Sequence, residues 1–483
     1  MEENQIIENK ELNIWEALFP VLVLVALLAF NVFVYGDGAL SGSNQFILLI
    51  GGAVAAVVGF MNKVPYQRMI EEVSNNVKST TEALLILLFV GALAGTWLIS
   101  GVIPSMIYYG LKLLNPTIFL PATVVICAII SIATGSSWTT SATVGIALVG
   151  IGQAIGIPLG MVAGAVISGA YFGDKMSPLS DTTNLAPAMA GGELFAHIRY
   201  MTLTTVPTIL ITLVIFVILG LTTTPTGSAD TGEILAAMRE KFYIHPVLFL
   251  VPAVVIFLIV RKTKPLIALL AGTLLGGVFA VVFQPDVVAA VAGVEKLDGL
   301  SAYKGVMDAM TVSTSVETDN PLLNDLFSAK GMSGMLGTIW LIICAMVFGG
   351  IMDAIGALAS ISRSLLSLAK TTFGLFGSTA ASCVVLNATA SDQYLAIVVP
   401  GKMFAKAYED RGLAPENLSR TLEDSGTVTS VLIPYNTCGA YQSGVLGVAT
   451  GEYFMYAIFN YLSPFMTLLY AGLNIKIKKL VAE

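Results

Sequence analysis

The chain has 483 residues, of which 56% are hydrophobic and only 11% are charged, and its formal net charge is −7. A soluble domain carries about a quarter charged residues, so this composition excludes an ordinary soluble protein and indicates a chain solvated mainly by lipid. No basic and aromatic cluster is present that would bind nucleic acid. The four cysteines show no disulfide or zinc spacing, and we expect them to be buried thiols.

Ten apolar runs are long enough to cross a bilayer about 30 Å thick. They lie near residues 15–35, 45–60, 83–100, 117–133, 200–221, 246–260, 265–283, 334–357, 374–390 and 453–475. The first run is preceded by an acidic segment, and no small-residue cleavage site follows it. This pattern predicts a retained helix and not a signal peptide. The stretches 134–190 and 391–450 are apolar but rich in Gly, Pro, Ser, Thr and Asp, which predicts broken or re-entrant helices. We therefore expect an all-α, multi-pass membrane protein with roughly 11 to 14 membrane segments.

Two parts of the chain resemble each other at an offset of about 255 positions. The matched positions are Gly95 with Gly350, Gly101 with Gly356, and residues 133–136 with residues 388–391. Small-residue matches in membrane sequence also arise by chance, so two generic apolar hairpins are the alternative. The shared offset favours a repeat, with a first half at 1–225, a linker at 226–244 and a second half at 245–483.

The basic residues of the short loops indicate that the two halves have opposite orientations in the membrane. Lysine and arginine favour the cytoplasmic side, which they mark at Lys63, Arg68 and Lys78, at Arg261, Lys262 and Lys264, and at Lys476, Lys478 and Lys479. The loop 36–44 has no basic residue, and the loop 284–333 carries seven acidic residues against three lysines, so both should be external. Matching loops thus lie on opposite sides, both termini should be cytoplasmic, and the repeat is predicted to be inverted.

Each half contains a hydroxyl-rich segment at the end of one predicted span. Eight of the thirteen residues from 131 to 143 are Ser or Thr, beside Gly135. A single hydroxyl usually bonds its own helix, but a cluster beside glycine predicts an unwound helix that exposes oxygens to a cation. Residues 387–394 repeat this pattern in the second half, and residues 423–429 mirror the segment 169–191.

Carboxylates in these segments are the candidate ion ligands, because a charge at membrane depth needs a partner or a task. Asp181 and Asp392 are the favoured titrating ligands for Na⁺, and Asp174 and Asp424 are further candidates. Oxygen donors would be Ser136, Ser137, Ser180, Thr182, Asn184, Asn387, Thr389, Ser391, Ser425 and Thr427. Lys175 is expected to pair with Asp174, either beside the site or at the headgroup level. Glu423 is expected at the cytoplasmic surface.

Four stretches carry a resemblance to a known family. The residues 164–191 (GAVISGAYFGDKMSPLSDTTNLAPAMAG), together with 135–152, 388–404 and 418–441, are similar to the NhaC family of Na⁺/H⁺ antiporters. The resemblance covers nearly the whole chain and implies a bacterial inner-membrane exchanger, with a transport domain moving against a scaffold, often in a homodimer. Superfamily relatives that carry dicarboxylates have Ser-Asn-Thr at hairpin tips. Here Ser180-Asp181-Thr182 and Ser391-Asp392 stand instead, which favours proton coupling.

Two transport hypotheses follow. In the first, one buried carboxylate site holds either Na⁺ or H⁺, since burial favours the protonated acid and a bound cation favours the ionised one. Alternating access then gives exchange without a further cofactor. In the second, the same scaffold exchanges a small organic acid such as malate or lactate, or an amino acid, at broken-helix N-termini. Lys402 would then neutralise a carboxylate, unless it simply reaches the cytoplasmic surface. No Ser/His pair or metalloprotease motif supports an enzyme, and a channel does not need two inverted halves.

Overall fold

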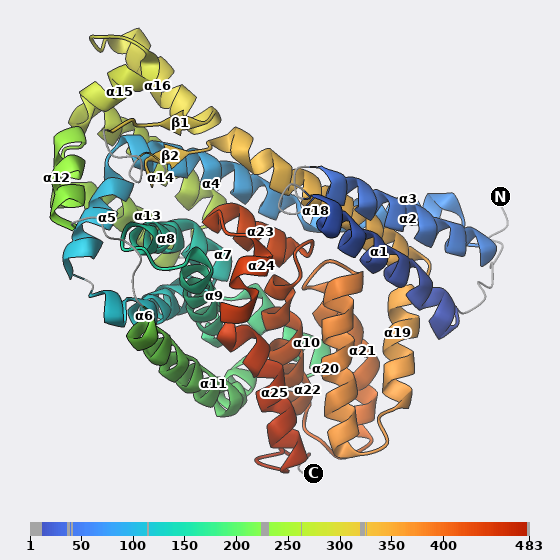
Figure 1. Cartoon of the computed structure of the whole chain (residues 1–483). Helices are drawn as coiled ribbons and strands as arrows, with labels where there is room; N and C mark the ends of the chain where they lie inside the picture. Colours follow the sequence, from blue (N-terminus) through green and yellow to red (C-terminus); the bar gives the residue numbers. More distant parts are fainter. Residues whose placement is uncertain are drawn as a thin grey trace.

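The computed structural model describes residues 12–35, 39, 42–113, 115–223, 231–261, 263–318, 324 and 326–480 (Figure 1). The first half contains α1 (Ile14–Tyr35), α2 (Ser43–Met61), α3 (Tyr66–Ser79), α4 (Thr81–Ile99), α5 (Val102–Leu113), α6 (Pro116–Thr134), α7 (Ser137–Thr140), the π-helix η2 (Ser141–Gly145), α8 (Ile146–Ala154), α9 (Leu159–Met176), α10 (Asp181–Ala190) and α11 (Leu194–Thr222). The predicted linker follows, and its described part is the helix α12 (Thr231–Lys241).

The second half begins with η3 (Pro246–Phe249), α13 (Leu250–Val260), α14 (Pro265–Phe283), α15 (Pro285–Ala292), α16 (Gly299–Thr311), β1 (Thr314–Ser315), β2 (Ser328–Ala329), η4 (Met332–Met335) and α18 (Leu336–Ala354). It continues with α19 (Ala357–Ser367), α20 (Thr372–Thr389), α21 (Leu395–Glu409), α22 (Pro415–Leu422), the π-helix η5 (Glu423–Thr427), η6 (Ser430–Leu432), α23 (Thr437–Leu446), α24 (Thr450–Tyr453), η7 (Phe454–Tyr456) and α25 (Ile458–Gly472). β1 and β2 form a two-residue antiparallel pair.

Seven helices in the described part of the chain are long and apolar enough to cross a membrane, which confirms a multi-pass helical protein. They are α1, α2, α4, α6, α11, α14 and the combined η4–α18. The bent pair formed by α12 and η3–α13, with an angle of 81°, would make an eighth. Further crossings would have to come from shorter or broken helices, so the expected 11 to 14 segments stay a prediction. The last predicted span, 453–475, becomes the short η7 followed by α25.

The predicted helix breaks lie where the hydroxyl-rich segments begin. α6 ends at Thr134 because Gly135 takes the left-handed conformation, with φ at 69°. α20 ends at Thr389, and Ser391 has a φ of 58°, which is uncommon for a residue other than glycine. Each half also contains one π-helical turn, η2 and η5, a geometry often found at functional sites. Both interruptions expected from the sequence are therefore present.

The paired glycines explain how the two halves are fitted together. Gly350 of α18 lies against the backbone of Val73 in α3, and a Cβ atom there would lie 2.7 Å from the Val73 Cα. Gly95 of α4 lies still closer to the backbone of Ala309 in α16, where a Cβ atom would overlap the Ala309 carbonyl. α3, which precedes α4, thus packs on α18 of the second half, and α16, which precedes α18, packs on α4 of the first half. The helices α1, α2, α3 and α18 lie together at one end of the molecule (Figure 1). Such reciprocal contacts are what an inverted repeat leads one to expect, although its boundaries stay a prediction.

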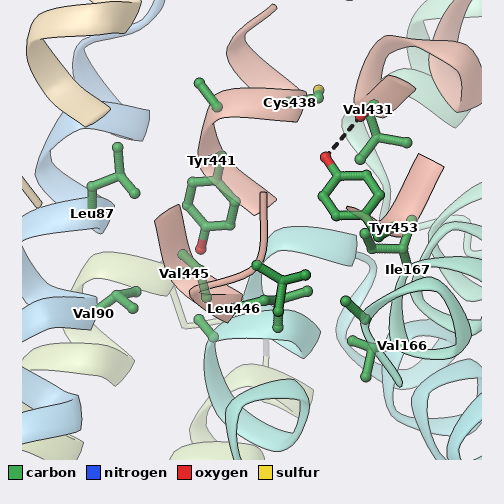
Figure 2. Close-up of a cluster of buried hydrophobic side chains, with 14 of the residues drawn as sticks. Leu87, Val90, Val166, Ile167, Val431, Cys438, Tyr441, Val445, Leu446 and Tyr453 are labelled. Carbon is green, nitrogen blue, oxygen red and sulfur yellow. Dashed lines mark hydrogen bonds between the residues drawn. The ribbon is translucent and has the colours of Figure 1, made fainter. Parts of the chain in front are cut away.

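A buried apolar cluster fills the space where α4, α9 and α23 approach one another (Figure 2). Leu87 and Val90 of α4 point toward Tyr441 and Leu446 of α23, and all four side chains are buried. The Tyr453 hydroxyl donates a hydrogen bond of 2.9 Å to the Val431 carbonyl beside them (Figure 2). The four cysteines are all free and buried, as the sequence predicted. This cluster borders the polar cavity described next, because Ile86, which directly precedes Leu87, lines that cavity.

Candidate functional site

A cavity of 510 Å³ lies between the two halves of the chain. Its polar wall is formed by the broken-helix segments of both halves, at Thr134, Gly135, Ser136, Asp174, Ser180, Asp181, Thr182, Asp392, Gln393, Tyr394 and Thr437. Its other wall is formed by the start of α4 and the connection between α13 and α14, at Ser79, Thr80, Glu82, Thr263 and Lys264. The segments 131–143, 169–191 and 387–394 therefore meet at one cavity, whereas the segment 423–429 does not reach it.

Four helix N-termini converge on this cavity. Ser136 caps α7 and Ser180 caps α10, while Asp392 accepts hydrogen bonds at the start of α21 and Asn436 caps α23. The first-half caps and their second-half counterparts, Ser136 with Asp392 and Ser180 with Asn436, are each 256 positions apart. Because a helix N-terminus carries a partial positive charge, this arrangement stabilises ionised carboxylates at the cavity wall.

Asp174 is held at the cavity by the broken helix that follows α6. Its Oδ2 accepts hydrogen bonds from the Ser137 hydroxyl at 2.6 Å and from the Ser137 amide at 3.1 Å. The side chain is 9% exposed. A carboxylate fixed by several donors, yet still lining a cavity, is suited to binding a small cation.

Removing the Ser137 hydroxyl tests this arrangement. Ser137→Ala is expected to raise the KM for the cation that the sequence predicts to bind here about 3- to 10-fold, since one net hydrogen bond contributes about 0.5–1.5 kcal/mol and the amide bond remains. The maximal rate should change less than the KM. Ser141→Ala, which alters a buried hydroxyl on the same broken helix that does not line the cavity, serves as control. Equal KM values for all three proteins would contradict the role assigned to Ser137.

Asp392 supplies the second-half carboxylate. Its Oδ1 accepts hydrogen bonds from the amides of Tyr394 at 2.8 Å and Leu395 at 3.1 Å, while Oδ2 has only a long contact of 3.5 Å with the Thr437 hydroxyl. One oxygen thus fixes the carboxylate, and the other is left for a ligand. Tyr394 lines the same cavity as Asp174, Asp181 and Asp392.

Asp181 also lines the cavity, but its side chain is exposed. It occupies the first position of α10, beside Thr182, whose hydroxyl lies 3.2 Å from that of Ser180. Asn184 is exposed and directs its amide to the carbonyls of Pro178 and Ser180, so it braces the turn and does not line the cavity. The structure therefore places Asp174 and Asp392 more deeply than Asp181.

Several predicted donors from the second half lie behind the cavity wall. Asn387 donates to the Gly426 carbonyl at 2.7 Å and to the Thr429 hydroxyl at 3.0 Å, which joins α20 to η5. The hydroxyls of Thr389, Ser391, Ser425 and Thr427 are buried without a hydrogen-bond partner among the described residues. None of these five residues lines the cavity.

The expected pairing of Lys175 with Asp174 is wrong. Lys175 forms an ion pair with Asp424 of η5 instead, and both side chains are fully buried. Neighbouring residues on a helix point in directions about 100° apart, so Lys175 faces away from its neighbour. Asp424 is consequently paired with a lysine and does not line the cavity, so its role as an ion ligand stays a prediction.

Two other charged residues also differ from expectation. Glu423 is fully buried, not at the cytoplasmic surface, because α22 enters the protein interior along its whole length. Lys402 is exposed and does not line the cavity, in keeping with a side chain that reaches the surface. The sequence reasoning missed Glu82 and Lys264, because charges flanking apolar runs were assigned to loops.

The arrangement suits an ion that is coordinated mainly by neutral oxygens. Within the described ranges, no three His, Cys, Asp or Glu side chains converge as a metal centre. A monovalent cation needs fewer charged ligands than a divalent one, and hydroxyl and carbonyl oxygens are at hand beside Asp174 and Asp392. His197, one of two histidines, is buried in α11, where its Nδ1 lies 2.7 Å from the Ser419 hydroxyl.

Broken helices that meet at a polar cavity between two halves of a membrane protein define the class of secondary transporters. The chain belongs to the Na⁺/H⁺ antiporter family, whose model matches residues 169–475. It is 34% identical to the Na⁺/H⁺ antiporter NhaC of Alkalihalophilus pseudofirmus over 98% of both chains. It is 35% identical to the malate-2H⁺/Na⁺-lactate antiporter of Bacillus subtilis, covering 95% of this chain and 93% of that one. It is 32% identical to the arginine/ornithine antiporter ArcD of Halobacterium salinarum, covering 94% and 90%.

Proposed function

We propose that this protein exchanges Na⁺ for H⁺ across the bacterial inner membrane. The observation that carries the proposal is the cavity in which Asp174 and Asp392, one from each half, each keep a carboxylate beside hydroxyl groups. Such a site binds a cation when the carboxylates are ionised and releases it when they are protonated. The family supports the same reaction.

The charge of the cavity supports a cationic substrate. Among the described residues that line it, four carboxylates (Glu82, Asp174, Asp181 and Asp392) stand against one lysine, Lys264. A dicarboxylate such as malate would meet repulsion from this wall. The volume of 510 Å³ exceeds what a bare Na⁺ needs, so the runner-up is an exchanger of a small organic solute. On charge, a cationic amino acid is favoured over an organic acid.

The basic loops indicate which way the cavity opens. It reaches Ser79 and Thr80, next to Lys78, and also reaches Lys264, and the positive-inside rule places both loops in the cytoplasm. The structure would then represent the inward-facing state, with both termini cytoplasmic. The apolar cluster around Tyr441 would close the path to the outside (Figure 2). A homodimer, as the superfamily resemblance implies, remains part of this proposal.

Proteoliposomes that contain the purified protein and an internal pH dye test the reaction. External Na⁺ is expected to make the lumen alkaline, whereas choline should have no effect. Labelled malate, lactate and arginine form the comparison panel. Exchange of a labelled solute without any Na⁺-dependent proton movement would establish the runner-up and overturn the proposal.

Competition between the two ions gives a pH dependence of defined sign. Protonation of the carboxylates removes the Na⁺ site, so the apparent KM for Na⁺ is expected to rise as the pH falls, by up to about tenfold per unit. Initial rates at saturating Na⁺ should change much less. Rates measured from pH 6 to pH 9 over a range of Na⁺ concentrations would check this. A KM that does not depend on pH would show that H⁺ and Na⁺ use separate sites.

A further inference from the structure

The buried ion pair of Lys175 and Asp424 joins the two halves directly behind the cavity. The two residues are 249 positions apart, and the side chains of both are fully buried. The lysine ammonium group also lies 5.7 Å from the centre of the Phe459 ring in α25. A buried ion pair is weak evidence for stability, since apolar residues of similar volume often stabilise a protein equally well. Its presence therefore calls for another explanation.

Asp424 is bound on all sides. Its Oδ1 accepts from Lys175, and its Oδ2 accepts from the Thr204 hydroxyl at 2.8 Å and from the Thr467 hydroxyl. These partners lie on α9, α11 and α25, so the carboxylate on η5 fixes three helices with respect to one another. Both oxygens of Asp424 are therefore engaged by side chains of the protein.

The lysine of this pair directly follows the carboxylate that lines the cavity. Asp174 and Lys175 occupy the last turn of α9, where their side chains point about 100° apart. The Thr183 hydroxyl lies 3.3 Å from the carbonyl of Asp174 and 3.1 Å from that of Lys175, which closes the end of the helix. If the lysine is fixed toward η5, the rotation of this turn is fixed too, and Asp174 must face Ser137.

We propose that Lys175 and Asp424 are positioning residues, whose ion pair sets the orientation of Asp174 in the transport site. The inference rests on the proposed function and extends it, because it assigns a role to charges that do not touch the ion. It also explains why the two charges are kept in the interior. The pair holds one carboxylate of the cavity in register with the second half of the chain.

Replacement of the whole pair separates orientation from stability. Lys175→Met/Asp424→Leu removes both charges at similar volume and should leave a folded protein with an unchanged size-exclusion profile. Its KM for Na⁺ is expected to rise at least about 10-fold, while the maximal rate falls less than about 3-fold, because a misplaced ligand weakens binding first. Lys175→Met alone should lose exchange altogether, since it leaves Asp424 buried without a counter-ion.

A second variant covers the case in which the double replacement does not fold. Thr204→Val/Thr467→Val keeps the ion pair but removes two donors that hold Asp424, and it should raise the KM for Na⁺ about 3- to 10-fold. The matched control is Lys478→Met/Glu416→Gln, which removes an ion pair of 2.6 Å at the other end of α22. It should behave as the wild type.

The outcomes distinguish the inference from the function on which it rests. Wild-type protein that shows no Na⁺-dependent proton movement would overturn the proposed function. Wild-type exchange, together with an unchanged KM in the folded pair variant, would overturn the positioning role. If the pair variant is unfolded, an unchanged KM for Na⁺ in Thr204→Val/Thr467→Val would overturn the positioning role instead.

Discussion

Asp392→Asn is expected to abolish Na⁺/H⁺ exchange while leaving the protein folded. The amide oxygen of asparagine still accepts hydrogen bonds from the Tyr394 and Leu395 amides, and asparagine caps helices as well as aspartate does. The negative charge at the cavity is lost, however. Since a contact to a charged ligand is worth up to about 3 kcal/mol, Na⁺ affinity should fall on the order of 100-fold. Because an asparagine side chain does not titrate, the variant also lacks the group that binds the exchanged proton.

Transport and binding of radioactive Na⁺ by purified protein would measure both effects. Asp298→Asn is the matched control, because Asp298 caps α16 through the Ser301 amide at 2.7 Å and does not line the cavity. Asp174→Asn should match Asp392→Asn, whereas Asp181→Asn, at an exposed position, should cost only about tenfold. Normal exchange by Asp392→Asn would remove this carboxylate from the mechanism.

Gly173→Val is expected to lower both the stability of the fold and the rate of transport, although Gly173 does not line the cavity. Gly173 and Gly169 of α9 form the small-residue face that packs on α6. A Cβ atom at Gly173 would lie 2.5 Å from the Ala128 carbonyl oxygen and from the Ser131 Cβ. Because the backbone of α6 cannot yield, α9 must move, and overpacking of this kind costs about 1–3 kcal/mol.

The displacement would also reach the site, since Asp174 is the next residue. An error of about 1 Å in a ligand costs on the order of 100-fold in activity. Thermal unfolding in detergent and exchange in proteoliposomes would report the two effects separately. Gly377→Ala is the control, because a Cβ atom at this helical position of α20 meets nothing within 4 Å. A Gly173→Val protein with native stability and transport would show that α6 and α9 are less tightly fitted than described.

The sequence predicted the features that depend on local chemistry. The spans α1, α2, α4, α6 and α11 follow from apolar run length, and the breaks at Gly135 and Ser391 follow from hydroxyl-rich segments with residues able to leave the helix. Asp174, Asp181 and Asp392 were found because a carboxylate is rare inside apolar sequence. Each of these three lines the cavity, although their role as ion ligands stays a prediction.

Features that depend on tertiary packing were missed or misassigned. The same hydroxyl-rich surroundings accompany a cavity carboxylate at Asp392 and a buried ion pair at Asp424, so local sequence does not separate the two. The partner of Lys175 lies in the other half, beyond the reach of any local pattern. Glu82 and Lys264 stand at the ends of apolar runs, where a charge is usual, and only the assembled fold brings them to the cavity.

The packing of α3 on α18 and of α16 on α4 has a consequence for biosynthesis. α3 and α4 leave the ribosome long before α18 and α16, the helices that cover Val73 and Gly95. The first half must therefore remain in the membrane with these close-fitting surfaces uncovered until the second half has been inserted. Final docking is then a late event that follows translation, and a truncated chain that ends before α16 would be a natural target for membrane proteases.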